Sequence, residues 1–241
     1  MSFHPNDFEN SPEALDIYAD IEDMTGVAEA APELYAHYLL TLQERAFDSL
    51  LDIGCGKGEF LASIAGAFPE SRLVGVDLSP AMVERAKEKG VDARVADICE
   101  MEEKFSVLTA IFDVLNYITP RRLAEFLSCV GERMQEGALF LCDINTVYGF
   151  EVVANGAMTA EDEDRFLAID SFYDDGIYRA DFTLFESTGE GLYRKRSGTI
   201  HQFYHSPESI ARAGGLRLLS STDIRLYAEE PDKQFLVFEK L

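Results

Sequence analysis

The sequence predicts an α/β protein with a doubly wound, seven-stranded, mostly parallel sheet and an antiparallel β layer inserted between strands five and six. Short apolar runs alternate with amphipathic helical patterns between Ser49 and Asp143, which is typical of a parallel sheet covered by helices on both faces. Three glycines follow the first apolar run, in LLDIGCGKGEF (residues 50–60). After Asn145, alternating polar and apolar residues indicate antiparallel strands.

The elements of the main sheet follow one another with recognisable boundaries. Apolar runs predict the first five strands at residues 49–53, 71–77, 91–97, 104–113 and 138–145. Helical patterns between them predict helices at residues 59–68, 79–90 and 120–137. The second of these opens on Ser-Pro, and the last two close on glycine, as helices commonly do.

The inserted layer is expected within residues 146–205, where Tyr, Phe and Thr are frequent and short turn signals separate the runs. A capped helix at 205–215 and two strands at 216–228 and 233–241 then complete the main sheet. The chain is therefore divided into a main domain, residues 1–145 and 206–241, and the inserted layer.

The charge of the chain restricts its partners. Its 241 residues include 44 acidic and 21 basic side chains, a net charge of −23. Such a surface repels phosphate backbones and anionic membranes, so we expect no nucleic-acid or membrane partner and a neutral or cationic small-molecule substrate. The sequence contains no 18-residue apolar run and no basic, apolar leader, so we expect a cytoplasmic protein. We also expect a monomer or a homodimer.

The four cysteines show no spacing typical of a zinc site or a redox pair. They stand at positions 55, 99, 129 and 142. We expect all four to be reduced, mostly buried thiols. A metal site is not expected either, because His201 and His205 would stand ~13 Å apart on a strand.

A strand that leads through glycines into a helix is a general site for nucleotides and nucleosides. Nicotinamide enzymes use GxGxxG, in which the third position must be small. Counted from Gly54, that position is Glu59, so the observed GxGxG favours another ligand.

Acidic residues at the ends of three consecutive strands make the nucleoside interpretation more specific. Asp52 and Asp77 end the first two strands, and Asp97 ends the third. Asp77 follows Gly58 by 19 residues, where a carboxylate accepts the two ribose hydroxyls. The carboxyl ends of parallel strands share one edge, so the three acids are expected to meet in one crevice.

Four stretches resemble motifs one to four of the class I S-adenosylmethionine-dependent methyltransferases, in the same order and spacing. They are DIGCGKGEF, VGVDLSP, VADI and FDVLNYI, within residues 49–143. The tail, with FDVLNYI and IHQFY, resembles a small-molecule group that includes aminosugar N-methyltransferases and glycine methyltransferase-like proteins. In that group an N-terminal Tyr-Asp pair closes the cofactor site; here Tyr18 is present, but Ala19 replaces the aspartate.

The resemblance implies a Rossmann-like fold, S-adenosylmethionine as cofactor, and an inserted layer that covers the substrate. It also implies a set of cofactor-binding residues: Tyr18, Asp52, Gly54, Cys55, Gly56, Asp77, Leu78, Met82, Asp97, Ile98 and Phe112. The glycine loop and Asp52 would meet the methionine part, and Asp77 the ribose. Asp97 and the Ile98 backbone would read the adenine amino edge, and the Phe112 carbonyl would lie near the methionyl group.

The implied reaction is an in-line methyl transfer to a nitrogen or oxygen of a small metabolite, in which alignment and water exclusion matter most. Candidate catalytic residues are Tyr117 and His201. Strand alternation puts His201 and Phe203 on one face and Gln202 on the other. If the first face looks into the crevice, His201 orients the acceptor or takes its proton; the alternative is a histidine bonded within the sheet.

Three other functions remain open at this level. A nicotinamide oxidoreductase would share the sheet, although Glu59 argues against it. An aminopropyltransferase would share the fold and an acidic pocket, although FDVLNYI resembles that group less. A non-catalytic S-adenosylmethionine-binding protein would need no catalytic side chain at all.

Overall fold

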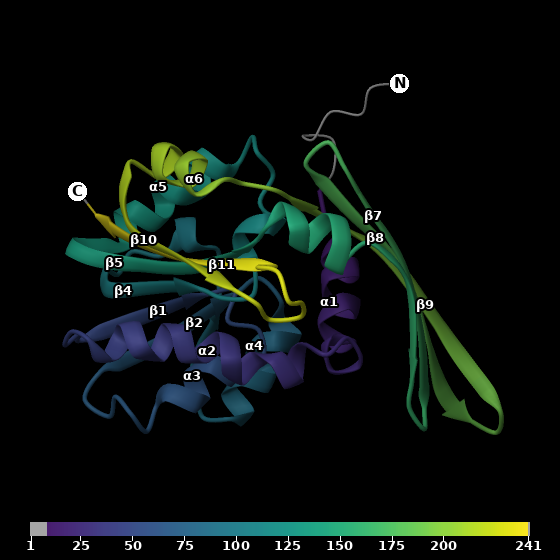
Figure 1. Cartoon of the computed structure of the whole chain (residues 1–241). Coiled ribbons are helices and arrows are strands. Elements are labelled where there is room, and N and C mark those ends of the chain that lie inside the picture. The colour runs from purple at the N-terminus through teal and green to yellow at the C-terminus, as the bar shows by residue number, and fades with distance from the viewer. Residues whose placement is uncertain (1–8, 241) are drawn as a thin grey trace.

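The computed structural model describes residues 9–240, which form a helix-covered main sheet and a second, projecting sheet (Figure 1). The main sheet has seven strands in the order β10-β11-β5-β4-β1-β2-β3. Their bounds are β1 Ser49–Ile53, β2 Arg72–Asp77, β3 Asp92–Val95, β4 Phe105–Ala110, β5 Met134–Asn145, β10 Leu216–Ile224 and β11 Lys233–Lys240. Only β11 runs in the direction opposite to the other six strands, which confirms the predicted seven-stranded, mostly parallel sheet.

Helices cover both faces of the main sheet. One face carries α2, α3 and α4, and the other carries α5 and α6 (Figure 1). Their bounds are α2 Val27–Gln43, α3 Glu59–Ile64, α4 Pro80–Glu88, α5 Leu123–Arg133 and α6 Pro207–Gly214. Helices α4 and α6 each begin with a serine cap followed by proline, whose fixed φ suits the first helical turn.

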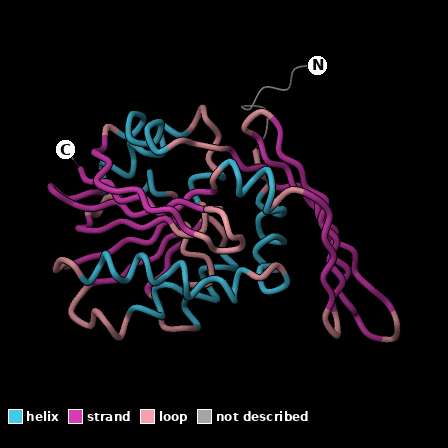
Figure 2. Tube along the Cα trace, viewed as in Figure 1, coloured by secondary structure: helices cyan, strands magenta, loops and turns pink. Residues whose placement is uncertain are grey.

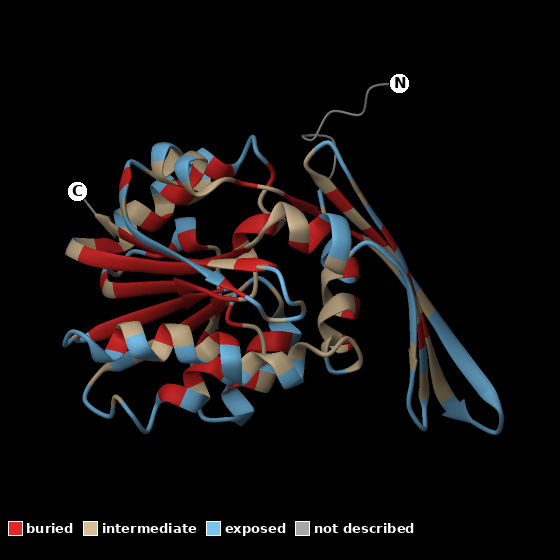
Figure 3. Ribbon diagram, viewed as in Figure 1, coloured by how far each residue is buried: buried red, intermediate tan, exposed pale blue. Residues whose placement is uncertain are grey.

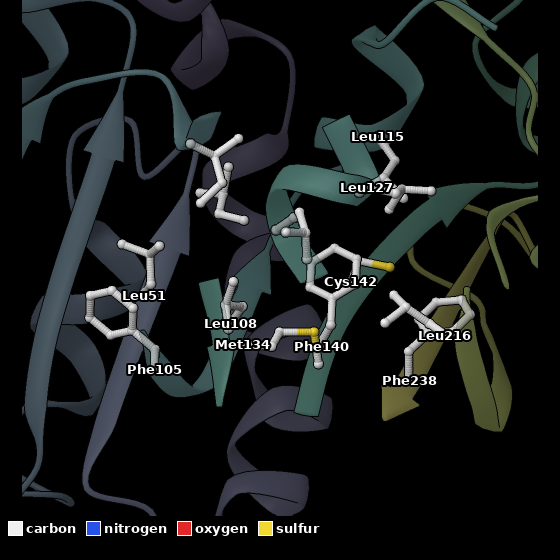
Figure 4. Close-up of a cluster of buried hydrophobic side chains, with 14 of the residues drawn as sticks. Leu51, Phe105, Leu108, Leu115, Leu127, Met134, Phe140, Cys142, Leu216 and Phe238 are labelled. Atoms are coloured by element: carbon white, nitrogen blue, oxygen red, sulfur yellow. The ribbon is translucent and has the colours of Figure 1, made fainter. Parts of the chain in front are cut away.

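The inner strands β1, β4, β5 and β11 of the main sheet are mostly buried because their apolar side chains meet helices on both sides (Figure 3). Figure 4 shows one of these cores, where Leu51 lies beside Phe105, Leu108 lies near Met134 and Phe140, and α5 contributes Leu127. All five residues of β1 are buried, so the end of this strand is held rigidly where the glycine loop begins.

The second sheet is the predicted antiparallel insertion, and its long strands project beyond the helices (Figure 2). It runs in the order β6-β7-β8-β9, with bounds β6 Gly156–Glu161, β7 Arg165–Asp174, β8 Ile177–Gly189 and β9 Leu192–Phe203. Alternate side chains, such as Ala180 and Phe182, are buried on one face. This inner face packs on α1 (Pro12–Asp20) and on the π-helix η5 (Gly149–Val153).

Several predicted boundaries differ from the structure. The helix predicted to end at Gly137 ends at Arg133, and Met134 already pairs with Phe105 in the sheet. Its side chain is completely buried, so long-range packing outweighs the local helical pattern there. The helix predicted at 59–68 ends at Ile64, and the strand predicted at 104–113 ends at Ala110.

The prediction of four reduced thiols is wrong for one pair. Cys99 and Cys129 form a disulfide with their Cα atoms 4.9 Å apart, joining the short helix η3 (Ile98–Glu100) to α5. The two residues are 30 positions apart, so only the packing of α5 against η3 brings them together. Cys55 and Cys142 are free and buried. Within residues 9–240, no helix combines the length and apolarity that a membrane crossing requires.

Candidate functional site

The glycine loop after β1 takes a conformation that side chains would disfavour. Gly54 (φ 69°) and Gly56 (φ 52°) both lie in the left-handed region. The Gly54 N–H donates to the Val76 carbonyl at 2.8 Å, which ties the loop to β2. A Cβ on Gly54 would lie 2.9 Å from Val114, whereas one on Gly56 would meet nothing within 4 Å. The loop is therefore packed on one side and open on the other, as a cradle for a ligand must be.

Asp77 connects this loop to the end of β2. Its two carboxylate oxygens accept the N–H groups of Gly56 at 2.9 Å and Ser79 at 2.8 Å. A carboxylate has about four acceptor positions, so two remain for hydroxyl groups. Burial raises the pKa of Asp77, partly offset by these two backbone bonds. The next residue, Leu78, is 67% exposed, which leaves an apolar surface beside the carboxylate.

The side chains of Asp52 and Cys55 are buried beneath the backbone of the glycine loop. Asp52 is only 3% exposed and accepts a 2.6 Å hydrogen bond from the Thr109 hydroxyl. Burial raises its pKa to about 7. The Cys55 thiol fills the space above Gly75, where an added Cβ would lie 2.6 Å from its sulfur. Cys55 therefore offers a ligand only its backbone, and burial raises the pKa of its thiol.

The residues expected around an adenine lie after the ends of β2 and β3. Asp97 serves as the N-cap of η3, because its carboxylate accepts the Cys99 N–H at 2.8 Å. The side chains of Ile98 and Met82 are buried, in η3 and α4 respectively. Those side chains serve the core, whereas Leu78 is exposed and Asp97 is half-buried.

The turn after β4 contains two consecutive residues with left-handed backbone, Phe112 (φ 58°) and Asp113 (φ 53°). Asp143, at the end of β5, accepts the Phe112 N–H at 2.8 Å and the Asp113 N–H at 2.9 Å, one on each oxygen. The Tyr38 hydroxyl donates to the same carboxylate at 2.7 Å. The Phe112 ring packs edge-on against Tyr35. Asp143 was not identified from the sequence.

A buried lysine forms ion pairs with two aspartates of this region. The Lys233 ammonium lies 2.5 Å from Asp113 and 3.2 Å from Asp143, and its side chain is 3% exposed. Burial alone would lower the pKa of Lys233, but the two carboxylates outweigh it and the pKa is raised. Burial also raises the pKa of Asp143, while Lys233 opposes that shift.

Polar side chains from three parts of the chain converge around Asp113. Gln202, on β9, donates to the Asp113 carboxylate at 2.5 Å and lies beside Tyr117 of η4 (Val114–Tyr117). Tyr18, on α1, lies near both Asp113 and Tyr117 and contacts the Phe182 ring. Burial raises the pKa of both tyrosines, so they stay protonated at neutral pH. This cluster lies where α1, the main sheet and the inserted layer meet (Figure 1).

His201 lies on the face of β9 opposite to Gln202 and therefore away from the cluster around Asp113. It pairs across the ladder with Arg179, whereas Gln202 pairs with the buried Tyr178. The His201 backbone is held by Asn10, which donates to its carbonyl at 2.8 Å and accepts its N–H at 2.7 Å. Alternation predicted the two faces correctly, but the apolar residues of β8 decide which one turns inward.

Residues 50–137 match the model of a family described as a methyltransferase domain. The match includes the glycine loop, Asp77, Asp97 and the left-handed turn after β4, on a sheet with the strand order described above. This segment is a methyltransferase domain.

Curated relatives are similar over part of the chain. The chain is 33% identical over 104 residues to a malonyl-[acyl-carrier protein] O-methyltransferase of Priestia megaterium, covering 42% of this chain and 34% of the relative. The chain thus spans about a third of that relative's length.

Solved methyltransferase structures are similar over almost the whole chain. An S-adenosylmethionine-dependent methyltransferase from Clostridium acetobutylicum superposes with a TM-score of 0.77 at 21% identity, covering 93% of this chain and 98% of that one. A sugar N-methyltransferase from Streptoalloteichus reaches a TM-score of 0.70 at 20% identity, covering 100% and 96%. These similarities show that the methyltransferase fold includes the inserted layer.

Three polar residues of the site lie outside the matched methyltransferase domain segment. Asp143, Gln202 and Lys233 come from β5, β9 and β11, after residue 137. Asn116, within FDVLNYI, links two of these strands: it donates to the Phe203 carbonyl at 2.8 Å and accepts the Asn145 N–H at 2.9 Å. The sequence signals for this part of the site were the acidic and amide residues of FDVLNYI and the IHQFY stretch that contains Gln202.

Proposed function

We propose that the protein is an S-adenosylmethionine-dependent methyltransferase that moves a methyl group to a nitrogen or oxygen of a small molecule. The observation that carries the proposal is the convergence of the open glycine loop, Asp77 and Asp97 at the carboxyl edge of a methyltransferase-type sheet. Residues 1–145 and 206–241 would bind the cofactor, and residues 146–205 would cover the acceptor. Residues 1–8 of the first segment lie outside the described residues.

The residues at this edge fit the cofactor. S-adenosylmethionine, when bound, supplies a methyl group on a positively charged sulfonium, and it also carries an ammonium. Carboxylates suit both charges better than they would suit a pyrophosphate. The open side of Gly56 provides a cradle that a Cβ would obstruct, and Asp77 keeps acceptor positions for two hydroxyls.

Each part of the cofactor has its own partners in this proposal. Asp77 accepts the ribose hydroxyls, with Leu78 and Met82 beside the adenine. Asp97 and the Ile98 backbone read the amino edge of the adenine. Asp52, the Gly54–Cys55 backbone and the Phe112 carbonyl surround the methionine part, and Tyr18 closes the site from α1.

The acceptor is proposed to lie beneath the inserted layer, beside Asp113, Tyr117 and Gln202. The Asp113 carboxylate favours an acceptor that carries an amino or hydroxyl group able to donate a hydrogen bond. Because burial keeps the Tyr117 phenol protonated, it acts as a hydrogen-bond donor that orients the acceptor. The chain's own work is then alignment and exclusion of water.

Calorimetry with S-adenosylhomocysteine and with NADH tests the cofactor assignment. We expect Asp77→Ala to weaken S-adenosylhomocysteine binding roughly ten- to a hundredfold, since a hydrogen bond to a charged group contributes about 1.5–3 kcal/mol. Asp170→Ala, an exposed acid on the outer face of β7, is the matched control and should bind normally. Unchanged affinity in Asp77→Ala, or tight NADH binding, would contradict the proposal.

A second experiment tests catalysis. The protein is incubated with methyl-labelled cofactor and a pool of amines and alcohols, and the release of S-adenosylhomocysteine is measured. We expect label in a small-molecule product. Tight cofactor binding without transfer to any pool member would favour a non-catalytic binding protein.

A further inference from the structure

The turn at Phe112–Asp113 is unusual because two consecutive residues with side chains take the left-handed conformation, which such residues rarely adopt. The turn directly follows β4, at the carboxyl edge of the main sheet. It also lies against the glycine loop, since Val114 is the residue that an added Cβ on Gly54 would strike. Backbone of this kind persists only where its surroundings hold it, and it gathers at ligand sites.

Asp143 holds the turn. One oxygen of its carboxylate accepts the Phe112 N–H, and the other accepts the Asp113 N–H. The carboxylate is completely buried at the end of β5. Tyr38 donates to the first oxygen and Lys233 to the second, at 2.7 Å and 3.2 Å, so the carboxylate itself is fixed from the other side.

This arrangement decides which backbone groups the turn offers to a ligand. Both N–H groups are used by Asp143, so the turn presents carbonyl oxygens. The Asp113 carbonyl accepts the Asn116 N–H at 2.8 Å. Among the hydrogen bonds of residues 9–240, none ends on the Phe112 carbonyl oxygen. The turn therefore supplies a backbone acceptor beside the glycine loop, which suits a cationic group and not an anion.

We propose that Asp143 is a positioning residue for the cofactor: by accepting both N–H groups it fixes the turn so that the Phe112 carbonyl accepts the ammonium of S-adenosylmethionine. This inference rests on the proposed function. Asp143 does not touch the cofactor; it acts through the backbone of the turn. Tyr38 and Lys233 hold the carboxylate in place.

Two nucleoside ligands separate positioning from general stability. S-adenosylhomocysteine carries the ammonium, and 5′-methylthioadenosine is the same nucleoside without the amino-acid part. We expect Asp143→Asn to weaken S-adenosylhomocysteine binding by about tenfold or more and 5′-methylthioadenosine binding by less than about twofold. The asparagine keeps the size of the side chain, but its NH₂ group opposes one backbone N–H and releases the turn.

Asp232→Asn is the matched control. Asp232 is a buried carboxylate that also accepts two consecutive N–H groups, those of Leu226 at 2.6 Å and Tyr227 at 3.0 Å. Its loss is expected to change the affinity for both ligands by the same factor. Tyr38→Phe removes one donor to Asp143 while keeping the ring, and it provides the test if Asp143→Asn fails to fold. It should show the same preference for losing S-adenosylhomocysteine, by a factor of about two to five.

The outcomes distinguish this inference from the proposed function. If the unchanged protein binds neither ligand, the proposed function fails. If it binds both, but the folded variants lose both equally or lose neither, Asp143 is a structural residue and the inference is overturned.

Discussion

The ammonium group of Lys233 lies 3.2 Å from the carboxylate of Asp143, and both side chains are buried at the carboxyl edge of the main sheet. Lys233 is the first residue of β11, and Asp143 lies near the end of β5. These two strands run antiparallel to each other. The pairing of these two strands therefore places one cation against the carboxylate that holds the Phe112–Asp113 turn.

Replacing the lysine should be strongly destabilising. Lys233→Met leaves the buried Asp143 and the half-buried Asp113 without their cation, and breaking a buried pair in this way costs about 3–5 kcal/mol. Urea denaturation would measure the loss in unfolding free energy. Arg217→Met is the control, because its partner Glu239 forms an exposed pair that contributes about 1 kcal/mol or less. Equal, small losses in both variants would contradict the buried-pair account.

The stability of the free protein should depend on Asp52. Its folded pKa is about 7, above the ordinary value of about 3.9, so the folded protein binds this proton more tightly than the unfolded chain. The contribution to stability is complete below about pH 4 and is lost as the pH rises to about 7. Urea denaturation at several pH values should show this loss in the native protein and not in Asp52→Asn, while equal pH profiles would refute it.

Cofactor affinity should change with pH in the opposite direction. An ionised Asp52 attracts the cofactor ammonium, so binding of S-adenosylmethionine should strengthen between about pH 6 and 8 and release protons near neutrality. Calorimetry in two buffers of different ionisation enthalpy would count these protons. In Asp52→Asn the release should disappear; if it persists, another group is responsible.

Gln202 and His201 should behave differently once an acceptor is known. Gln202→Ala removes a contact to Asp113 and Tyr117, so we expect kcat/KM to fall by about tenfold or more with cofactor affinity unchanged. His201→Ala changes the outer face of β9, and its kcat should stay within about twofold. A large fall in kcat for His201→Ala, with an unchanged melting temperature, would reverse this assignment.

The disulfide should be detectable and stabilising. Denatured, unreduced protein should show two reactive thiols, and reduced protein four. Closing a loop of 30 residues is expected to contribute about 3–4 kcal/mol by chain entropy, so Cys129→Ser should lower the unfolding free energy by about that amount. Four thiols in the unreduced protein would show that the bond is absent.

The sequence by itself determined the main sheet, its order of strands and helices, and the glycine loop with Asp77. These depend on local patterns: apolar runs, capping serines, and glycines whose spacing is visible within a few residues. The same local logic predicted the two faces of β9 correctly. It did not predict which face turns inward, because that depends on Tyr178 and its apolar neighbours on another strand.

Only the tertiary structure decided how Asp143, Lys233 and Gln202 meet Asp113. They come from three strands and are 30 to 120 positions from Asp113, with no motif to connect them. Similarly, the disulfide depends on α5 packing against η3, and the early end of α5 depends on Met134 filling the core. Such contacts are chosen by the packing of whole elements, because burying a charge or an apolar side chain is favourable only where distant partners complete its surroundings.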